Sequence, residues 1–102
     1  MLIAEDETRV LVAPQHLVAE SRHEFRRAAL EHLERVARCG ATRLVVDMRH
    51  TKEIDASGLG VLVLLQKRGR DLMIATKLLH APVAVKQMLE LTKLDYLFEI
   101  EG

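Results

Sequence analysis

A serine between an aspartate and two glycines is the part of this sequence best suited to chemistry. Ser57 lies in the segment Ile54-Asp55-Ala56-Ser57-Gly58-Leu59-Gly60, which joins an apolar run ending at Met48 to another that starts at Val61. A hydroxyl on a connection from a strand to a helix can cap the helix. A phosphate attached to that hydroxyl would meet free backbone N–H groups. Ser57 is therefore the first candidate for function.

Three roles for Ser57 are compatible with this spacing. It can be a helix N-cap with no further role, which typically contributes about 1 kcal/mol of stability. It can be a phosphorylation site, because a helix N-terminus tolerates the roughly −1.5 to −2 charges of a phosphate, although Asp55 opposes them. It can be a nucleophile, but the hydrolase elbow needs glycine two residues before and two residues after the serine, where this chain has Asp55 and Leu59. The spacing therefore does not decide between a helix cap and a phosphorylation switch. A serine hydrolase is kept only as a remote alternative.

The neighbours of Ser57 favour a docking surface over a catalytic site. Glycines have no side chains, so a partner can approach the backbone closely at Gly58 and Gly60. Asp55 is either a turn residue bonded to nearby backbone, which we favour, or a group that tunes a phosphate or is recognised by a kinase. We expect no catalytic residue and predict a partner-binding surface formed by Asp55, Ala56, Gly58, Leu59 and Gly60.

Composition argues against several other kinds of site. The five histidines and the single cysteine, Cys39, form no H-x-x-x-H or Cys/His cluster, so neither a metal site nor an internal disulfide is predicted. Gly58-Leu59-Gly60 is no dinucleotide fingerprint and the chain has no P-loop, so we expect no cofactor. With 15 basic and 15 acidic residues and few aromatics, nothing favours nucleic acid or an anionic membrane as a partner.

The length of 102 residues predicts one domain, 1–102, with a single modest core. The first residues run into Glu5-Asp6-Glu7, unlike a secretory signal, which needs basic residues and then a longer apolar stretch. The longest apolar run, 59–65, is much shorter than the roughly 20 residues that cross a bilayer. We therefore expect a soluble, cytoplasmic protein without direct membrane insertion.

Apolar periodicity predicts strands that alternate with helices, and hence an α/β fold with a partly parallel sheet. The charged side of the first helix mixes both signs and is interpreted as a solvated face; it carries Arg22, Glu24, Arg26, Arg27, Glu31, Glu34 and Arg35, and His23 and His32 are placed on the same solvated part. His50, after a strand end, is either a loop residue, which we favour, or a sensor of a nearby phosphate. Strands are predicted at 9–13, 44–48, 75–79 and 96–100, and helices at 19–38, from Ser57 through 61–65 to Arg70, and at 82–91.

Two stretches resemble the signature of the STAS domain, the family of the anti-sigma factor antagonists and of the cytoplasmic domains of sulphate transporters. They are Leu44-Val45-Val46-Asp47-Met48 and the segment from Ile54 through D-x-S-G-L-G to Leu62. The tail, 81–85 and 89–98, is similar to the later helix and final strand of the family. The resemblance covers about residues 9–100. It implies a mixed β-sheet of about four to five strands with helices packed mainly on one face.

The resemblance also implies a function. In anti-sigma factor antagonists, the serine that matches Ser57 is phosphorylated by a partner that is both an anti-sigma factor and a serine kinase of the histidine-kinase-like ATPase type. The unphosphorylated antagonist binds this partner and frees the sigma factor, and phosphorylation breaks the complex. The chain is thus expected to be a stand-alone bacterial switch in transcription signalling, not an enzyme. The alternative is a scaffold subunit of a membrane transporter complex or signalling assembly that is not switched at Ser57.

The chain departs from the family pattern at four places. Many members carry Gly-x-Leu-Asp, with the aspartate near the phosphosite, where this chain reads Pro14-Gln15-His16-Leu17; this departure motivates the scaffold alternative. Lys93 stands where the family often has glycine, so a left-handed conformation there would be mildly strained. Residues 70–74 lack the usual glycine turn. The chain stops at Gly102, so the last helix of many relatives is expected to be absent.

Overall fold

Strands and helices alternate along the chain, as the hydrophobic pattern predicts. The computed structural model describes residues 10–102. Their elements are β1 (Val10–Val12), β2 (His16–Leu17), α2 (Arg22–Arg38), β3 (Arg43–Asp47), β4 (Glu53–Ile54), α3 (Ala56–Asp71), β5 (Ala75–Leu79), α4 (Val83–Leu91), the 3₁₀ turn η1 (Asp95–Leu97) and β6 (Glu99–Glu101). The start of the first predicted strand, Arg9, lies outside the described residues.

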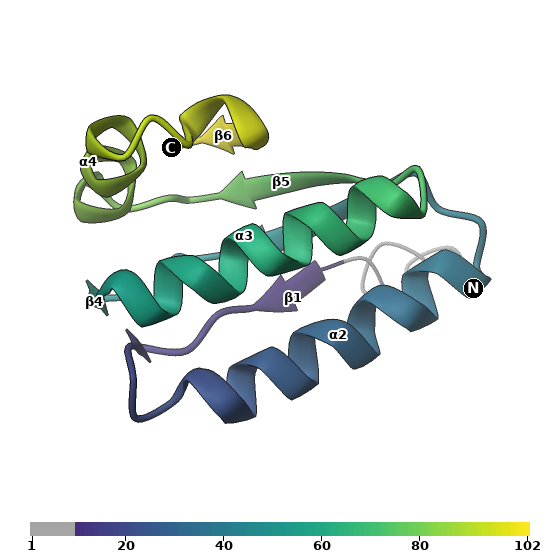
Figure 1. The fold of residues 1–102 in the computed structure, drawn as a ribbon, viewed down its shortest axis with the longest axis horizontal. Coiled ribbons are helices and arrows are strands. Elements are labelled where there is room, and N and C mark those ends of the chain that lie inside the picture. Colours follow the sequence, from purple (N-terminus) through teal and green to yellow (C-terminus); the bar gives the residue numbers. More distant parts are fainter. Residues whose placement is uncertain (1–9) are drawn as a thin grey trace.

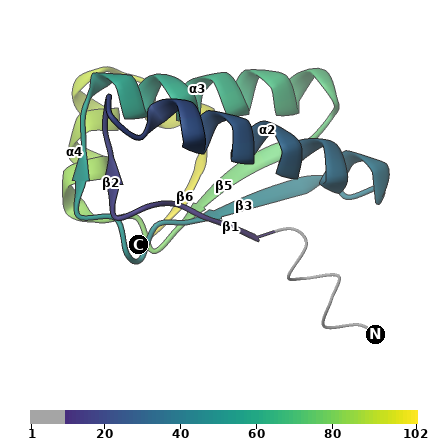
Figure 2. The same ribbon diagram turned by 90° about the horizontal axis from the view of Figure 1, so that it is seen from below.

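The main sheet has the strand order β1-β3-β5-β6, and its neighbouring strands are all parallel (Figures 1 and 2). A helix lies between successive strands of this sheet, so each strand starts again from the same end. The short strands β2 and β4 form a second, parallel pair. The predicted STAS-like α/β fold is confirmed. Within residues 10–102, however, the sheet is parallel throughout rather than mixed.

The main helices α2 and α3 cover the same face of the sheet, as the family resemblance implies (Figure 2). Side chains alternate across the sheet, so Leu44, Val46 and Leu78 point toward the helices and are fully buried. Leu62 and Leu65 of α3 meet them from above and are 0% and 1% exposed. The other face of β3 is only partly covered, since its alternate residues Arg43 and Val45 are exposed and half-buried.

Helix α2 begins at Arg22, three residues later than predicted. The preceding residues form a turn instead, in which the Ser21 N–H donates to the Val18 carbonyl oxygen (3.0 Å) and the Ser21 hydroxyl donates to that of His16 (2.5 Å). The placement of His32 on the solvated face is also wrong. This histidine is only 7% exposed, because it lies on the same stripe as the buried residues Ala29 and Leu33.

Within residues 10–102, each of the helices α2, α3 and α4 is followed by a residue in the left-handed conformation. Gly40 follows α2 with φ 77°, Met73 follows α3 with φ 62°, and Lys93 follows α4 with φ 61°. The left-handed conformation considered for Lys93 from the family pattern is confirmed. Met73 falls in the stretch 70–74 that lacks the family's glycine turn. Two of the three helix ends therefore use a residue whose Cβ opposes this geometry.

The C-terminal segment differs from the prediction in detail. Helix α4 starts at Val83 with Pro82 as its N-cap residue, one position later than predicted. The strand predicted over 96–100 is wrong in its first half. Residues Asp95–Leu97 form the 3₁₀ turn η1 instead, because the Leu97 N–H donates to the Leu94 carbonyl oxygen at 3.1 Å. The strand that follows, β6, is Glu99–Glu101. No helix within residues 10–102 is long and apolar enough to span a bilayer.

Candidate functional site

The residue that caps α3 is Asp55, so the prediction of Ser57 as N-cap is wrong. Asp55 has extended backbone angles (φ −123°, ψ −174°), as an N-cap residue requires. One carboxylate oxygen, Oδ1, accepts from the Gly58 N–H at 3.0 Å, and the other, Oδ2, accepts from the Ala19 N–H at 3.1 Å. Asp55 thereby joins the start of α3 to the loop before α2. Ser57 is the second residue of the helix, and its side chain has no part in the cap.

The N–H groups around Asp55 also fix its charge. The hydrogen bond from Gly58 is the main cause that lowers the pKa of the Asp55 carboxyl below its ordinary value; partial burial opposes it, and the hydrogen bond from Ala19 adds to it. The carboxyl is therefore ionised at neutral pH, as a cap that accepts two N–H groups should be.

Gly58 and Leu59 lie in the interior, so they cannot be part of the exposed docking surface that was predicted. A Cβ at Gly58 would overlap the Leu17 carbonyl oxygen and lie 2.8 Å from the carbonyl carbon, which means that the first turn of α3 packs directly on β2. Leu59 is 6% exposed and belongs to the core. Ala56 and Gly60 are exposed, and Asp55 is half-buried. The close approach that glycine permits at Gly58 is used within the chain and is not open to a partner.

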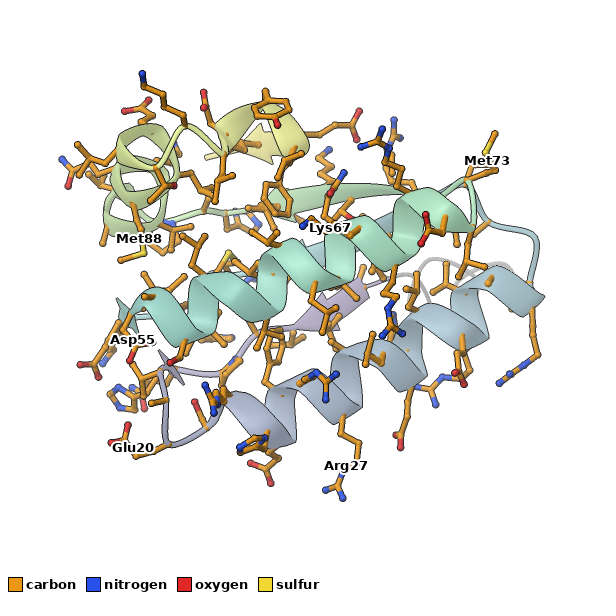
Figure 3. The ribbon with its side chains drawn as sticks, in the orientation of Figure 1. Glu20, Arg27, Asp55, Lys67, Met73 and Met88 are labelled. Atoms are coloured by element: carbon orange, nitrogen blue, oxygen red, sulfur yellow. The ribbon has the colours of Figure 1, made fainter. Side chains whose placement is uncertain are left out.

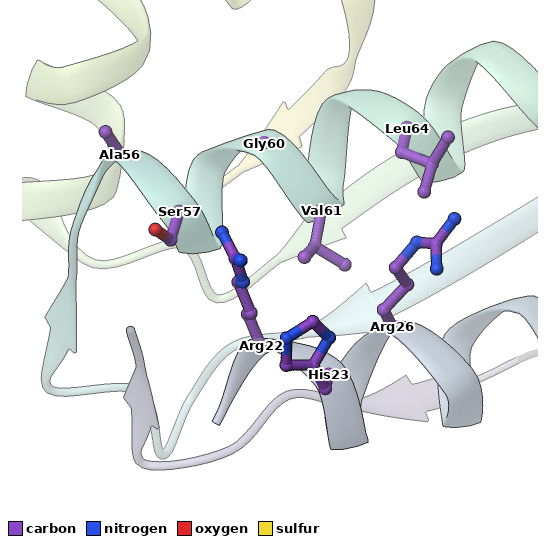
Figure 4. Close-up of a pocket in the computed structure, with 8 residues that line it drawn as sticks. All are labelled: Arg22, His23, Arg26, Ala56, Ser57, Gly60, Val61 and Leu64. Atoms are coloured by element: carbon purple, nitrogen blue, oxygen red, sulfur yellow. The ribbon is translucent and has the colours of Figure 1, made fainter. Parts of the chain in front are cut away.

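Ser57 is half-buried and lines an open cavity of about 540 Å³ between the first turns of α2 and α3 (Figure 4). Helix α3 contributes mostly small and apolar residues along one side, and α2 contributes basic residues along the other. The cavity is lined by Arg22, His23, Arg26, Ala56, Ser57, Gly60, Val61 and Leu64. His50 is exposed and is not among them, so the histidine beside Ser57 is His23.

The lining of this cavity contains two arginines and no carboxylate. Among residues 10–102, neither Arg22 nor Arg26 forms an ion pair. The ion pairs of this part of the chain lie elsewhere: His16–Glu53, Arg43–Glu99, Arg49–Asp47 and Lys77–Glu101. The cavity around Ser57 is therefore basic although the whole chain has no net charge.

Sequence reasoning missed this basic lining because it assigned Arg22, His23 and Arg26 to a solvated face of mixed sign. The signal that was available is their spacing: Arg22 and Arg26 are four residues apart and so lie on one side of the helix. The sequence does not reveal which side of α2 turns toward α3. Only the packing of the two helices places these arginines beside Ser57.

The stretch that lacks the family's Gly-x-Leu-Asp runs into β2, which is joined to β4 by a side-chain hydrogen bond. His16 in β2 and Glu53 in β4 are register partners, and Nδ1 of His16 lies 2.7 Å from Oε1 of Glu53. The Leu17 carbonyl oxygen next to His16 accepts from the Asp55 N–H at 3.2 Å. The β2–β4 pair thus supports the start of α3 although β2 contains no aspartate.

The described residues offer little for catalysis or metal binding. Between residues 10 and 102, the Ser57 hydroxyl has no hydrogen bond to a histidine or a carboxylate, which a nucleophile needs for activation. Nor does this part of the chain contain three or more histidine, cysteine or acidic side chains placed to hold one metal ion. The geometry supplies an accessible hydroxyl and positive charge, but no nucleophile–base pair.

Comparison with known proteins gives a family and a fold. The family model described as "Mlab, STAS domain" matches residues 2–99. The crystal structure of a candidate anti-sigma factor antagonist, TM1081 from Thermotoga maritima, superposes with a TM-score of 0.76 at 23% identity, over 92% of this chain and 80% of that one. An NMR structure of TM1081 gives a TM-score of 0.71 at 23% identity, over 89% and 70%. No curated protein sequence matches the chain significantly.

Proposed function

This chain belongs to the STAS domain family, and from that premise we propose that it is a non-enzymatic docking protein switched by phosphorylation at Ser57. In this role it resembles anti-sigma factor antagonists. The unmodified chain binds an anti-sigma factor that is also a serine kinase of the histidine-kinase-like ATPase type. Phosphorylation of Ser57 then releases it.

One observation carries this proposal: Asp55 caps α3, so the hydroxyl of Ser57 is left without a structural task at an open cavity. Phosphoryl transfer would form a bond between Ser57 Oγ and the γ-phosphorus of ATP, break the bond from that phosphorus to the bridging oxygen, and release ADP and the hydroxyl proton. The product carries a dianion near the positive end of α3, where a negative charge is tolerated. Modification can therefore change the surface and leave the fold intact.

The docking surface of this proposal is formed by the exposed residues on either side of Ser57, Ala56 and Gly60. A Cβ at Gly60 would meet no atom within 4 Å, so this part of α3 is flat and open to a partner. Asp55, Gly58 and Leu59 act from beneath, since they fix the first turn of α3 on β2 and on the loop before α2.

The test is direct phosphorylation. The protein is incubated with each histidine-kinase-like serine kinase of its host and ATP, and the product is mapped by mass spectrometry. We expect one phosphate, on Ser57, none in Ser57→Ala, and a stable complex with the same kinase when ATP is omitted. Absence of both phosphate and complex with every kinase would refute the proposal.

A second function, a scaffold subunit of a transporter complex or signalling assembly, is favoured by one observation. The stretch that lacks the family's Gly-x-Leu-Asp contains His16, which is hydrogen-bonded to Glu53 and gives this part of the surface a different chemistry. A pull-down with candidate transporter ATPase subunits separates the two functions. Capture that is equally strong with the wild type, Ser57→Ala and Ser57→Asp would support the scaffold.

A further inference from the structure

We infer that the cavity beside Ser57 is an anion-binding site of this chain, in which Arg22 and Arg26 hold the phosphoryl group of phosphorylated Ser57. The inference rests on the proposed function, because it concerns what happens to the phosphate after the transfer. It adds an intramolecular contact that neither the family match nor the serine alone supplies.

The placement of the two arginines is the first argument. Arg22 and Arg26 lie one turn apart on α2 and line the same cavity as Ser57 (Figure 4). Arg27, which directly follows Arg26, is exposed, does not line the cavity and points away from α3 (Figure 3). The cavity therefore receives a selected pair of arginines and not the general charge of the helix.

The lack of a competing acid is the second argument. No carboxylate lines the cavity, and among residues 10–102 neither arginine has an ion-pair partner. Asp55, the N-cap residue of α3, has both carboxylate oxygens engaged with the N–H groups of Gly58 and Ala19. Both guanidinium groups are thus available to a new anion, and guanidinium forms its strongest hydrogen bonds to phosphate and carboxylate.

The volume and position of the cavity are the third argument. A phosphate on Ser57 would project from the first turn of α3 into a cavity of about 540 Å³, which has room for it without movement of the backbone. The N-terminus of this helix and the two arginines would act on the same group. His23 also lines the cavity and offers a ring N–H as a further hydrogen-bond donor. Phosphorylation would thus turn an open basic cavity into a filled, charge-paired surface.

The test needs no kinase. Phosphoserine is incorporated at position 57 during translation, with a suppressor tRNA, and its second ionisation is followed by phosphorus NMR against pH. We expect the second pKa of the folded protein to lie about one unit below that of the same protein in urea, because opposite charges at close range favour the dianion. In Arg22→Gln/Arg26→Gln most of this shift should disappear, whereas Arg27→Gln should keep it.

Either result for the double variant decides the inference. A shift that survives the loss of both arginines would be due to the helix N-terminus alone and would overturn the inference. Circular dichroism of the double variant and of Arg27→Gln shows whether both are folded, and the single variants Arg22→Gln and Arg26→Gln repeat the test if the double variant is not. If a kinase phosphorylates Ser57 but the second pKa of the phosphate does not depend on the two arginines, this inference alone fails. If the second pKa of the phosphate depends on the arginines but no kinase phosphorylates or binds the protein, the proposed function alone fails.

Discussion

The Ser57 hydroxyl lies at the surface of the cavity and has no hydrogen bond to the acid that caps its helix, so replacement of this side chain should affect docking and not folding. We predict that Ser57→Asp keeps the fold and weakens binding to the partner kinase about tenfold or more, because the new charge imitates part of a phosphate. Ser57→Ala should bind as tightly as the wild type. Isothermal titration calorimetry measures the affinities, and thermal unfolding reports the fold. Equal affinities of Ser57→Asp and the wild type would count against the switch.

Gly58 and Gly60 lie two residues apart on α3 and should respond to alanine with opposite signs. At Gly58 the new Cβ would overlap backbone atoms of Leu17, which cannot move aside as a side chain can, so we predict a loss of about 2–3 kcal/mol. At Gly60 the Cβ meets nothing within 4 Å, so Gly60→Ala should stabilise by about 0.5–1 kcal/mol through helix propensity.

Urea denaturation of the two glycine variants measures both effects, and each serves as the control for the other. Binding of the partner kinase to Gly60→Ala adds a second readout, because this position is exposed and flanks Ser57. Equal stability of the two variants would show that the first turn of α3 does not pack on β2 as described.

Asp55 should make stability depend on pH in the acid range. Its pKa is lowered in the folded state, mainly by the Gly58 N–H, so the carboxylate stabilises the fold at any pH above the unfolded pKa of about 3.9. This contribution is lost as the pH falls through the lower, folded pKa. We predict a smaller loss of stability between about pH 5 and pH 2 for Asp55→Asn, because asparagine can cap the helix but does not titrate.

Glu101 must be separated from Asp55 in this experiment. The pKa of Glu101 is also lowered, mainly by the hydrogen bond from Lys77, so the contribution of Glu101 to the stability of the fold is lost over the same pH range. Because both proteins contain Glu101, the difference between the wild type and Asp55→Asn isolates the cap. If the wild type and Asp55→Asn give parallel curves of urea midpoint against pH, the Asp55 carboxylate does not have the lowered pKa that its two hydrogen bonds imply.

At the residue scale, the sequence predicts which segment matters but not the task of each residue in it. Asp and Ser are both favoured N-cap residues, so the choice of Asp55 depends on where β4 ends and on the reach of its carboxylate to Ala19. The role of Gly58 depends on β2, which lies about 40 residues earlier in the chain. The spacing of residues around Ser57 therefore predicts neither the choice of Asp55 as the cap nor the packing of Gly58 on β2.

Among the elements of residues 10–102, the C-terminal ends of α2, α3 and α4 provide a comparison within one molecule. All three are left-handed, but only the first has glycine, at Gly40. A residue with a Cβ costs roughly 1–2 kcal/mol in this conformation, part of which glycine gives back through the entropy of its unfolded state. We predict that Met73→Gly and Lys93→Gly each stabilise the protein by about 0.5–1 kcal/mol, as measured by thermal and urea unfolding.

The matched control for these helix-end variants is Gly40→Ala, which should destabilise by a similar amount. Met73 is 83% exposed and projects outward beyond the end of α3, so its side chain loses little packing when it is removed (Figure 3). A loss of stability in both glycine variants would mean that these residues contribute packing that outweighs their backbone strain.

Most elements were predictable because their patterns are local. The strand Ala75–Leu79 has the bounds predicted for it, and the apolar run after Ser57 continues as a helix with Arg68 and Arg70 in its last turn. The errors occur where a turn competes with a regular element: Ser21 closes a turn before α2, and η1 replaces half of the last predicted strand. Such turns depend on single hydrogen bonds, which periodicity does not reveal.

On the scale of the whole molecule, the two layers separate the candidate docking surface from the open face of the sheet. The cavity at Ser57 is formed by α2 and α3, which cover one face (Figure 2). Lys77 lies on the other face, because its neighbours Thr76 and Leu78 are buried beneath α3. There it forms an ion pair with Glu101, with Nζ 2.6 Å from Oε1. The sequence alone does not reveal which face of the sheet α2 and α3 cover.

The separation of the two faces predicts where substitution interferes with docking. Gly60→Gln adds a long neutral side chain to the helical layer beside Ser57, where it meets open space and fits a helix. We expect it to weaken binding of the partner kinase about tenfold or more, because it lies within the contact area. Lys77→Gln places the same side chain on the open sheet face, where the lost ion pair is worth less than about 1 kcal/mol. It should leave affinity within about twofold of the wild type, a change of less than 0.5 kcal/mol. Weak binding of Lys77→Gln together with normal binding of Gly60→Gln would place the docking surface on the sheet and reject the one proposed around Ser57.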